Sequence, residues 1–191
     1  MAAALNVLSI CGSLRKGSFN AIVMRALPAL APEGMIVAPA PPYDKFPIYN
    51  FDIQHEQGIL ADVTTLGHAM LAADGVVIVT PENNFTIPAG LKNAIDWLSR
   101  MKEPSPFTNK PFAIQSATTG PVGGARMQYH LRQVLNGLDA LVLNKPEIFI
   151  GNAKSKVDEQ KGELTDETTK DFIRKQLANF AKFIEQVRVK R

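Results

Sequence analysis

Short apolar runs alternate along the chain with segments in which apolar residues recur every three or four positions. The runs at residues 5–10, 35–38, 75–80, 112–118 and 141–150 have the length of buried strands. Helical spacing follows each of them, at residues 19–30, 63–71, 88–98 and 127–138 and from about residue 165 onward. Five such units predict an α/β fold with a parallel sheet between two layers of helices.

Few strand orders agree with right-handed crossovers. We predict a five-stranded, doubly wound sheet in the order 2-1-3-4-5. In that order the winding reverses between strands one and three, and ligands bind beyond the carboxyl ends of the strands at that point. We therefore expect the functional residues in the loops after strands one, three and four.

Composition adds few constraints. The chain has 191 residues, of which 46% are hydrophobic and 20% charged, and its net charge is +3. This length fits a single domain spanning residues 1–191 that needs no disulfide or metal to hold it together. The pI near 9.0 makes the surface mildly basic, which suits anionic ligands. A basic stripe with interleaved aromatic residues is missing, so nucleic acid is not an expected partner.

Neither membrane insertion nor secretion is expected. The longest strongly apolar run, residues 76–79, falls far short of the ~20 residues that a membrane helix needs. The apolar N-terminus carries no basic residue before Arg15, unlike a secretory signal. The single cysteine, Cys11, closes an apolar run and is expected to be a buried small side chain. These features favour a cytoplasmic protein.

One segment breaks the alternation. Four prolines fall within residues 39–47, with aromatic residues at 43, 46, 49 and 51. Regular structure is not expected there, and a long ordered loop is often functional.

The loop after the first strand is rich in hydrogen-bond donors. It reads Gly12, Ser13, Leu14, Arg15, Lys16, Gly17, Ser18, Phe19, Asn20 and leads into a helix. An arginine fork, two hydroxyls and the free N–H groups of a helix start together suit a phosphate. A plain helix cap needs only one such residue. The loop lacks the Gly-x-Gly-x-x-Gly of dinucleotide sites and the lysine of a nucleotide P-loop, so a phosphomonoester such as that of FMN is favoured.

Two further loops carry candidate ligand contacts. Pro81, Glu82, Asn83, Asn84 and Phe85 follow the third strand, and the two amide side chains both donate and accept hydrogen bonds, as the edge of a flavin does. Ser116, Ala117, Thr118 and a glycine-rich stretch follow the fourth strand, where small residues let the backbone approach a flat ring. Ordinary structural loops are the alternative at both places.

The chain resembles the NADPH-dependent FMN reductase family, and within it the bacterial quinone and chromate reductases. Gly-Ser-Leu-Arg-x-Gly-Ser-x-Asn at residues 12–20 and Pro-Glu-x-Asn at residues 81–84, followed by Leu-Lys-Asn-Ala-Ile-Asp-Trp at residues 91–97, carry the resemblance. It implies a flavodoxin-like fold, one FMN per subunit and a homodimer or homotetramer. It implies that the phosphate is held by Ser13, Arg15, Ser18 and Asn20. It also implies that the isoalloxazine is lined by Glu82, Asn83, Asn84 and Phe85 and that residues 116–118 cover its pyrimidine side. Asn83 stands where the family usually has tyrosine, and Thr86 where it often has serine.

The implied activity is a two-step hydride relay, from NADH or NADPH through FMN to quinones, chromate or another small oxidant. No catalytic side chain and no metal is needed, because the cofactor carries the chemistry. His55, His68 and His130 lack the spacing of metal ligands and are expected in surface or structural roles, and Trp97 in packing. The alternatives are a flavodoxin-type electron carrier and an FMN-binding protein without its own turnover.

Overall fold

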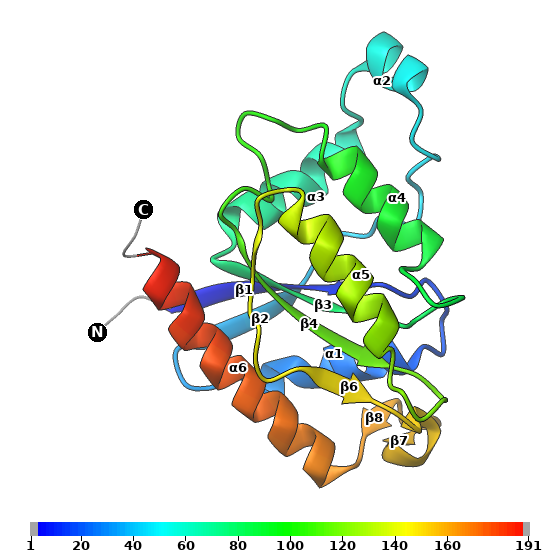
Figure 1. The fold of residues 1–191 in the computed structure, drawn as a ribbon, viewed down its shortest axis with the longest axis vertical. Coiled ribbons are helices and arrows are strands. Elements are labelled where there is room, and N and C mark those ends of the chain that lie inside the picture. Colours follow the sequence, from blue (N-terminus) through cyan, green and yellow to red (C-terminus); the bar gives the residue numbers. More distant parts are fainter. Residues whose placement is uncertain (1–3, 189–191) are drawn as a thin grey trace.

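Five β-α units in the predicted order make up the part of the chain that the computed structural model describes, residues 4–188 (Figure 1). The strands are β1 (Leu5–Cys11), β2 (Met35–Pro39), β3 (Gly75–Val79), β4 (Pro111–Ala117), β5 (Leu141–Val142), β6 (Ile148–Ile150), β7 (Val157–Asp158) and β8 (Glu163–Leu164). The helices are α1 (Phe19–Leu30), α2 (Phe51–Gln57), α3 (Ala61–Ala72), α4 (Ala89–Leu98), α5 (Ala125–Asn136) and α6 (Glu167–Arg188), with one 3-10 turn, η1 (Ala153–Lys156). No helix among residues 4–188 is long and apolar enough to cross a membrane.

The main sheet is parallel and has the order β2-β1-β3-β4-β5, which confirms the predicted topology. One detail differs, because the predicted strand at residues 141–150 is two short strands. Both β5 and β6 pair with β4, one near its start and the other at its end. Pro146 lies between them, and proline has no N–H with which to continue a ladder.

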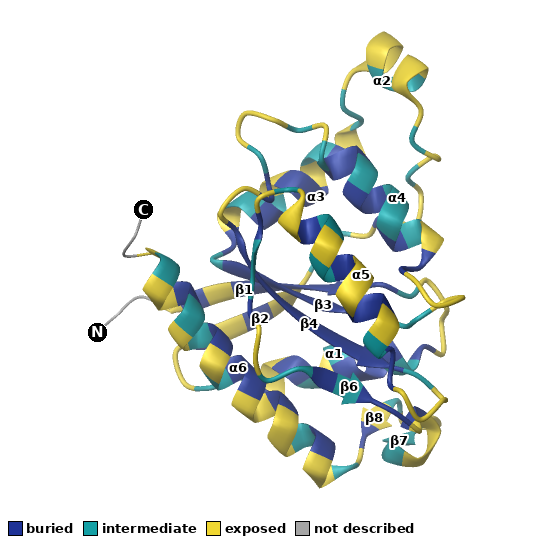
Figure 2. Ribbon diagram, in the orientation of Figure 1, coloured by how far each residue is buried: buried dark blue, intermediate teal, exposed yellow. Residues whose placement is uncertain are grey.

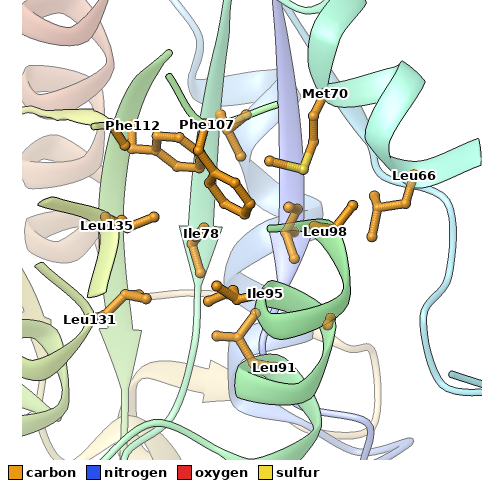
Figure 3. Packing of buried hydrophobic residues seen from close by; sticks show 14 of the residues in the cluster. Leu66, Met70, Ile78, Leu91, Ile95, Leu98, Phe107, Phe112, Leu131 and Leu135 are labelled. Atoms are coloured by element: carbon orange, nitrogen blue, oxygen red, sulfur yellow. The ribbon is translucent and has the colours of Figure 1, made fainter. Parts of the chain in front are cut away.

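Helices cover both faces of the sheet. Side chains alternate along β3, so that Val76 and Ile78 pack under α3, α4 and α5, while Val77 and Val79 pack under α1 and α6. Figure 3 shows Ile78 among Leu91 and Ile95 of α4 and the rings of Phe107 and Phe112. The central strands β3 and β4 are buried along their whole length in Figure 2, as the continuous apolar run of β3 predicts, whereas the edge strand β2 has exposed residues.

The proline-rich segment forms an arm, residues 40–58, that carries α2 away from the body of the molecule (Figure 1). Its loop part agrees with the prediction, whereas the sequence analysis did not predict α2. The carbonyl of Pro47 accepts hydrogen bonds from the Trp97 indole, 2.8 Å, and from the Asn93 amide, 2.9 Å. Trp97 is fully buried, so its predicted packing role is confirmed. The motif at residues 91–97 therefore anchors the arm.

The polar stretch that follows β6 also has more structure than its sequence suggests. It contains η1 and the antiparallel pair β7–β8. Asp166 caps the start of α6, where its carboxylate accepts hydrogen bonds from the backbone N–H of Thr169, 2.8 Å, and from its hydroxyl, 2.5 Å. These bonds hold the pKa of Asp166 below its ordinary value.

Candidate functional site

A cavity of about 510 Å³ lies at the carboxyl ends of the strands, where the three predicted loops meet. We call it the flavin cavity, after the cofactor that the family resemblance implies. Of the residues predicted from sequence, Ser13, Leu14, Arg15, Ser18, Phe19, Asn20, Pro81, Glu82, Asn83, Ala117 and Thr118 line it. Lys16, Gly17, Asn84, Phe85 and Ser116 belong to the same loops but are not among its lining residues. The predicted loops thus converge, although not every residue in them faces the cavity.

Close packing of β1 against β3 forms the floor of this region. The N–H of Gly12 donates to the carbonyl of Val79, 2.8 Å. A Cβ at position 12 would lie 2.0 Å from the Thr80 hydroxyl oxygen, so only glycine lets the first loop lie against the third strand.

The first loop presents an uncompensated cation beside a helix start. Ser18 caps α1 by accepting a hydrogen bond from the N–H of Ala21, 3.4 Å. The guanidinium of Arg15 lies over the Phe19 ring, 5.4 Å from its centroid, and forms no ion pair within residues 4–188. This cation, two nearby hydroxyls and the positive end of α1 make the strongest anion site of the cavity wall.

Asn20 lines the cavity and also makes two hydrogen bonds within the protein. Its side chain is buried, its amide nitrogen donates to the carbonyl of Ala117, 2.8 Å, and its oxygen accepts from the Ala117 N–H, 2.9 Å. This pair of bonds ties the start of α1 to the end of β4. Asn20 therefore holds two walls of the cavity together.

The loop after β3 contains a tight two-residue turn. Asn83 and Thr86 exchange two backbone hydrogen bonds of 3.0 Å, and the residues between them, Asn84 and Phe85, have φ of 46° and 70°. Positive φ at both central positions is the geometry of a type I′ turn. It is strained for a phenylalanine, and such strain concentrates at functional sites.

Contacts with α5 hold this turn in place. The guanidinium of Arg126 lies 3.8 Å from the Phe85 ring centroid and pairs with the Glu82 carboxylate, 2.5 Å. The hydroxyl of Thr86 is 2.9 Å from Nδ1 of His130. Phe85 thus packs against α5, Glu82 both pairs with α5 and lines the cavity, and Asn83 lines the cavity beside it.

The end of β4 uses a buried hydroxyl to shape the opposite wall. Ser116 donates to the carbonyl of Gly123, 2.5 Å, and accepts from the Gln128 amide, 2.7 Å. It lies behind the wall, and Ala117, Thr118 and Thr119 form the surface itself. Sequence reasoning missed Thr119, as it missed Pro88, Ala89 and Gly90 at the start of α4. The short run of small residues after Pro88 is the sequence signal that could have indicated that segment.

The remaining candidate side chains do not form a catalytic cluster. Cys11 is partly rather than fully buried; its thiol lies 3.4 Å from the carbonyl of Ser13, and burial raises its pKa, so it stays protonated. The three histidines are exposed, in agreement with the prediction. Within the described part of the chain, no group of three or more His, Cys, Asp or Glu side chains could hold a metal.

Similarity to known proteins extends over nearly the whole chain. The family model described as NADPH-dependent FMN reductase matches residues 5–155. A quinone reductase of Escherichia coli is 50% identical over 189 residues, which cover 99% of this chain and 100% of that protein. An NAD(P)H-dependent FMN reductase of Pseudomonas aeruginosa is 40% identical over 184 residues, covering 96% and 97%. A solved flavoenzyme, an NAD(P)H:acceptor oxidoreductase of Paracoccus denitrificans, superposes with a TM-score of 0.83 at 29% identity, over 96% of this chain and 98% of that one.

Proposed function

The chain belongs to the NADPH-dependent FMN reductase family, and from this membership we propose that it is an FMN-dependent NAD(P)H:quinone reductase whose flavin binds in the cavity between the three loops. The supporting observation is the first loop. Arg15 lies beside the start of α1 and forms no ion pair in the described structure. The hydroxyls of Ser13 and Ser18 lie in the same loop. That donor set matches the phosphate of FMN.

The rest of the cavity fits the isoalloxazine. Its volume, about 510 Å³, lies within the range of about 300–1,000 Å³ typical of cofactor sites. Asn83 offers an amide that can both donate and accept hydrogen bonds at the ring edge. Ala89, Gly90 and Ala117 are small enough for a flat ring to lie against the backbone.

FMN bound here would supply the redox chemistry, which is hydride transfer from NAD(P)H and two-electron reduction of the acceptor. In the overall reaction, NAD(P)H, one proton and a quinone give NAD(P)⁺ and the hydroquinone. The protein holds the phosphate through Arg15, orients the ring edge through Asn83 and fixes the cavity walls through Asn20. None of these residues needs to form a covalent bond with substrate.

We propose quinones as the acceptors because the relative in Escherichia coli is named a quinone reductase. Chromate is a second candidate that the net charge of +3 favours through long-range attraction of anions. Asn83, which replaces the tyrosine usual in the family, would tune the choice of acceptor. We also propose a homodimer or homotetramer in the cytoplasm, as the family resemblance implies.

Steady-state kinetics of the FMN-loaded protein test this proposal. NADH or NADPH is mixed with 1,4-benzoquinone, and with chromate in a parallel series. Rapid oxidation of the nicotinamide without a second protein supports the reductase. Oxidation only after a partner reductase is added would instead identify an electron carrier of the flavodoxin type.

A further inference from the structure

A second cavity lies beside the flavin cavity. Its volume is about 270 Å³, and the two cavities share Ser13 and Leu14 as a common wall. The far side of the second cavity is formed by the base of the arm, from Ala40 to Asp44, and its remaining wall includes Met24 of α1. We call it the arm cavity. The proline-rich segment, which does not line the flavin cavity, thus contributes to the wall of the arm cavity.

Part of the arm cavity wall is apolar and suits the face of a flat ring, and Ser9, Cys11 and Ser13 add polar groups to the lining. Pro41, Pro42 and Met24 are apolar. The Tyr43 side chain is held in place because its hydroxyl donates to the carbonyl of Cys11, 2.6 Å. The volume lies just under the lower end, about 300 Å³, of the range for whole ligand sites, so it fits a fragment of a larger ligand.

One exposed carboxylate lines this cavity, and two exposed cations lie near its ridge. Asp44 is the one carboxylate in its lining, is exposed to solvent, and forms no ion pair within residues 4–188. Leu14, on the ridge between the two cavities, is 57% exposed and is followed by two exposed cations, Arg15 and Lys16. Lys16 is likewise without an ion pair in the described part of the chain. A ligand that spans both cavities would cross a cationic ridge and end beside a carboxylate.

We propose that the arm cavity binds the adenosine half of the nicotinamide dinucleotide and that Asp44 makes NADH the better donor. The adenine ring would lie between the prolines and Met24, and the diphosphate would cross the ridge beside Lys16, so that the nicotinamide reaches the flavin cavity. A carboxylate accepts hydrogen bonds from ribose hydroxyls but repels the 2′-phosphate of NADPH. This inference rests on the proposed function, since it concerns the donor of the same reaction.

Calorimetric binding of ADP-ribose, which contains the adenosine half but no nicotinamide, tests the site without turnover. The FMN-loaded protein is titrated with ADP-ribose and with 2′-phospho-ADP-ribose. Pro42→Trp fills the cavity with an indole and should weaken ADP-ribose binding at least tenfold. Asp44→Asn removes the charge and should at least halve the preference for ADP-ribose over its 2′-phosphate. Asp52→Asn, an equally exposed carboxylate on α2 outside the cavity lining, is the matched control and should change neither value.

Kinetics separate this inference from the proposed function. With benzoquinone as acceptor, Pro42→Trp should raise the KM for NADH several-fold at unchanged kcat, and leave the KM for reduced nicotinamide mononucleotide unchanged. If Pro42→Trp binds ADP-ribose as the unmodified protein does, or if Asp44→Asn leaves the 2′-phosphate preference unchanged, the inference is wrong even though the reductase turns over. If ADP-ribose binds but nicotinamide oxidation fails, the proposed function is wrong and the adenosine site stands.

Discussion

Asn20→Leu is the substitution that best separates a structural role from a ligand-binding one. Leucine has the branched shape of asparagine, although it is larger, and it can form neither of the bonds to Ala117, 2.8 and 2.9 Å. Both residues are at most 2% exposed, so water cannot replace the lost partner. The substitution therefore leaves an N–H and a carbonyl of Ala117 without their side-chain partner.

The size of the effect follows from these two groups. A buried backbone group that loses its hydrogen bond costs about 1–3 kcal/mol, so the free energy of unfolding should fall by about 2–6 kcal/mol. The loss should be present in the apoprotein, because both bonds lie within the protein. FMN affinity should fall as well, because the start of α1 and the end of β4, which form two walls of the cavity, are no longer held together.

Urea denaturation of the apoprotein, followed by circular dichroism, measures this loss, and Arg15→Ala serves as the comparison. Arg15 is exposed and unpaired in the described structure, so its removal should change the unfolding free energy by less than about 0.5 kcal/mol. If Asn20→Leu leaves apoprotein stability unchanged and only weakens FMN binding, Asn20 is a ligand contact and the structural argument is refuted.

Three further predictions test other parts of the account. Arg15→Ala should weaken FMN binding about 10- to 100-fold, because a charge-assisted hydrogen bond contributes about 1.5–3 kcal/mol; quenching of FMN fluorescence measures it, and unchanged affinity would remove Arg15 from the site. Asn83→Tyr should change the ratio of kcat/KM between quinones of different size while FMN stays bound, and identical ratios would place position 83 outside the acceptor pocket. The pKa of Asp166 is lowered by its bonds from Thr169, so the stability that Asp166 provides is complete above its ordinary pKa of 3.8 and is lost as pH falls through its lower folded value. The free energy of unfolding of Asp166→Asn should therefore fall less as the pH is lowered. If urea denaturation at a series of acidic pH values shows the same fall as in the unmodified protein, the capping role of Asp166 is contradicted.

The sheet could be predicted from sequence because its signal is local and continuous. Residues 75–79 are apolar at every position, and such runs occur where helices cover both faces of a strand. The strand order could be predicted because strands alternate with helices along the chain and crossovers between parallel strands are right-handed. The arm helix α2 gave no such signal, because none of its residues is buried and its position depends on contacts of Asn93 and Trp97 with the segment before it.

The site could be predicted as a set of loops but not residue by residue. The sequence shows that Glu82, Asn83 and Phe85 share one loop. Only the structure shows that Arg126 contacts Glu82 and Phe85 from α5, and that Glu82 and Asn83 line the cavity whereas Phe85 does not. Asn20 and Ala117 are 97 positions apart, so no local pattern reveals their pairing. The arm cavity likewise depends on the fold, since it joins residues of β1, α1 and the proline-rich segment.

The most direct test of the central claim is the visible absorbance of the FMN-loaded protein under anaerobic conditions, with NADH added first and benzoquinone second. The account predicts that flavin absorbance falls on the first addition and returns on the second, with no other protein present. If the protein binds no flavin, or if NADH leaves the absorbance unchanged until a partner reductase is supplied, the account is contradicted.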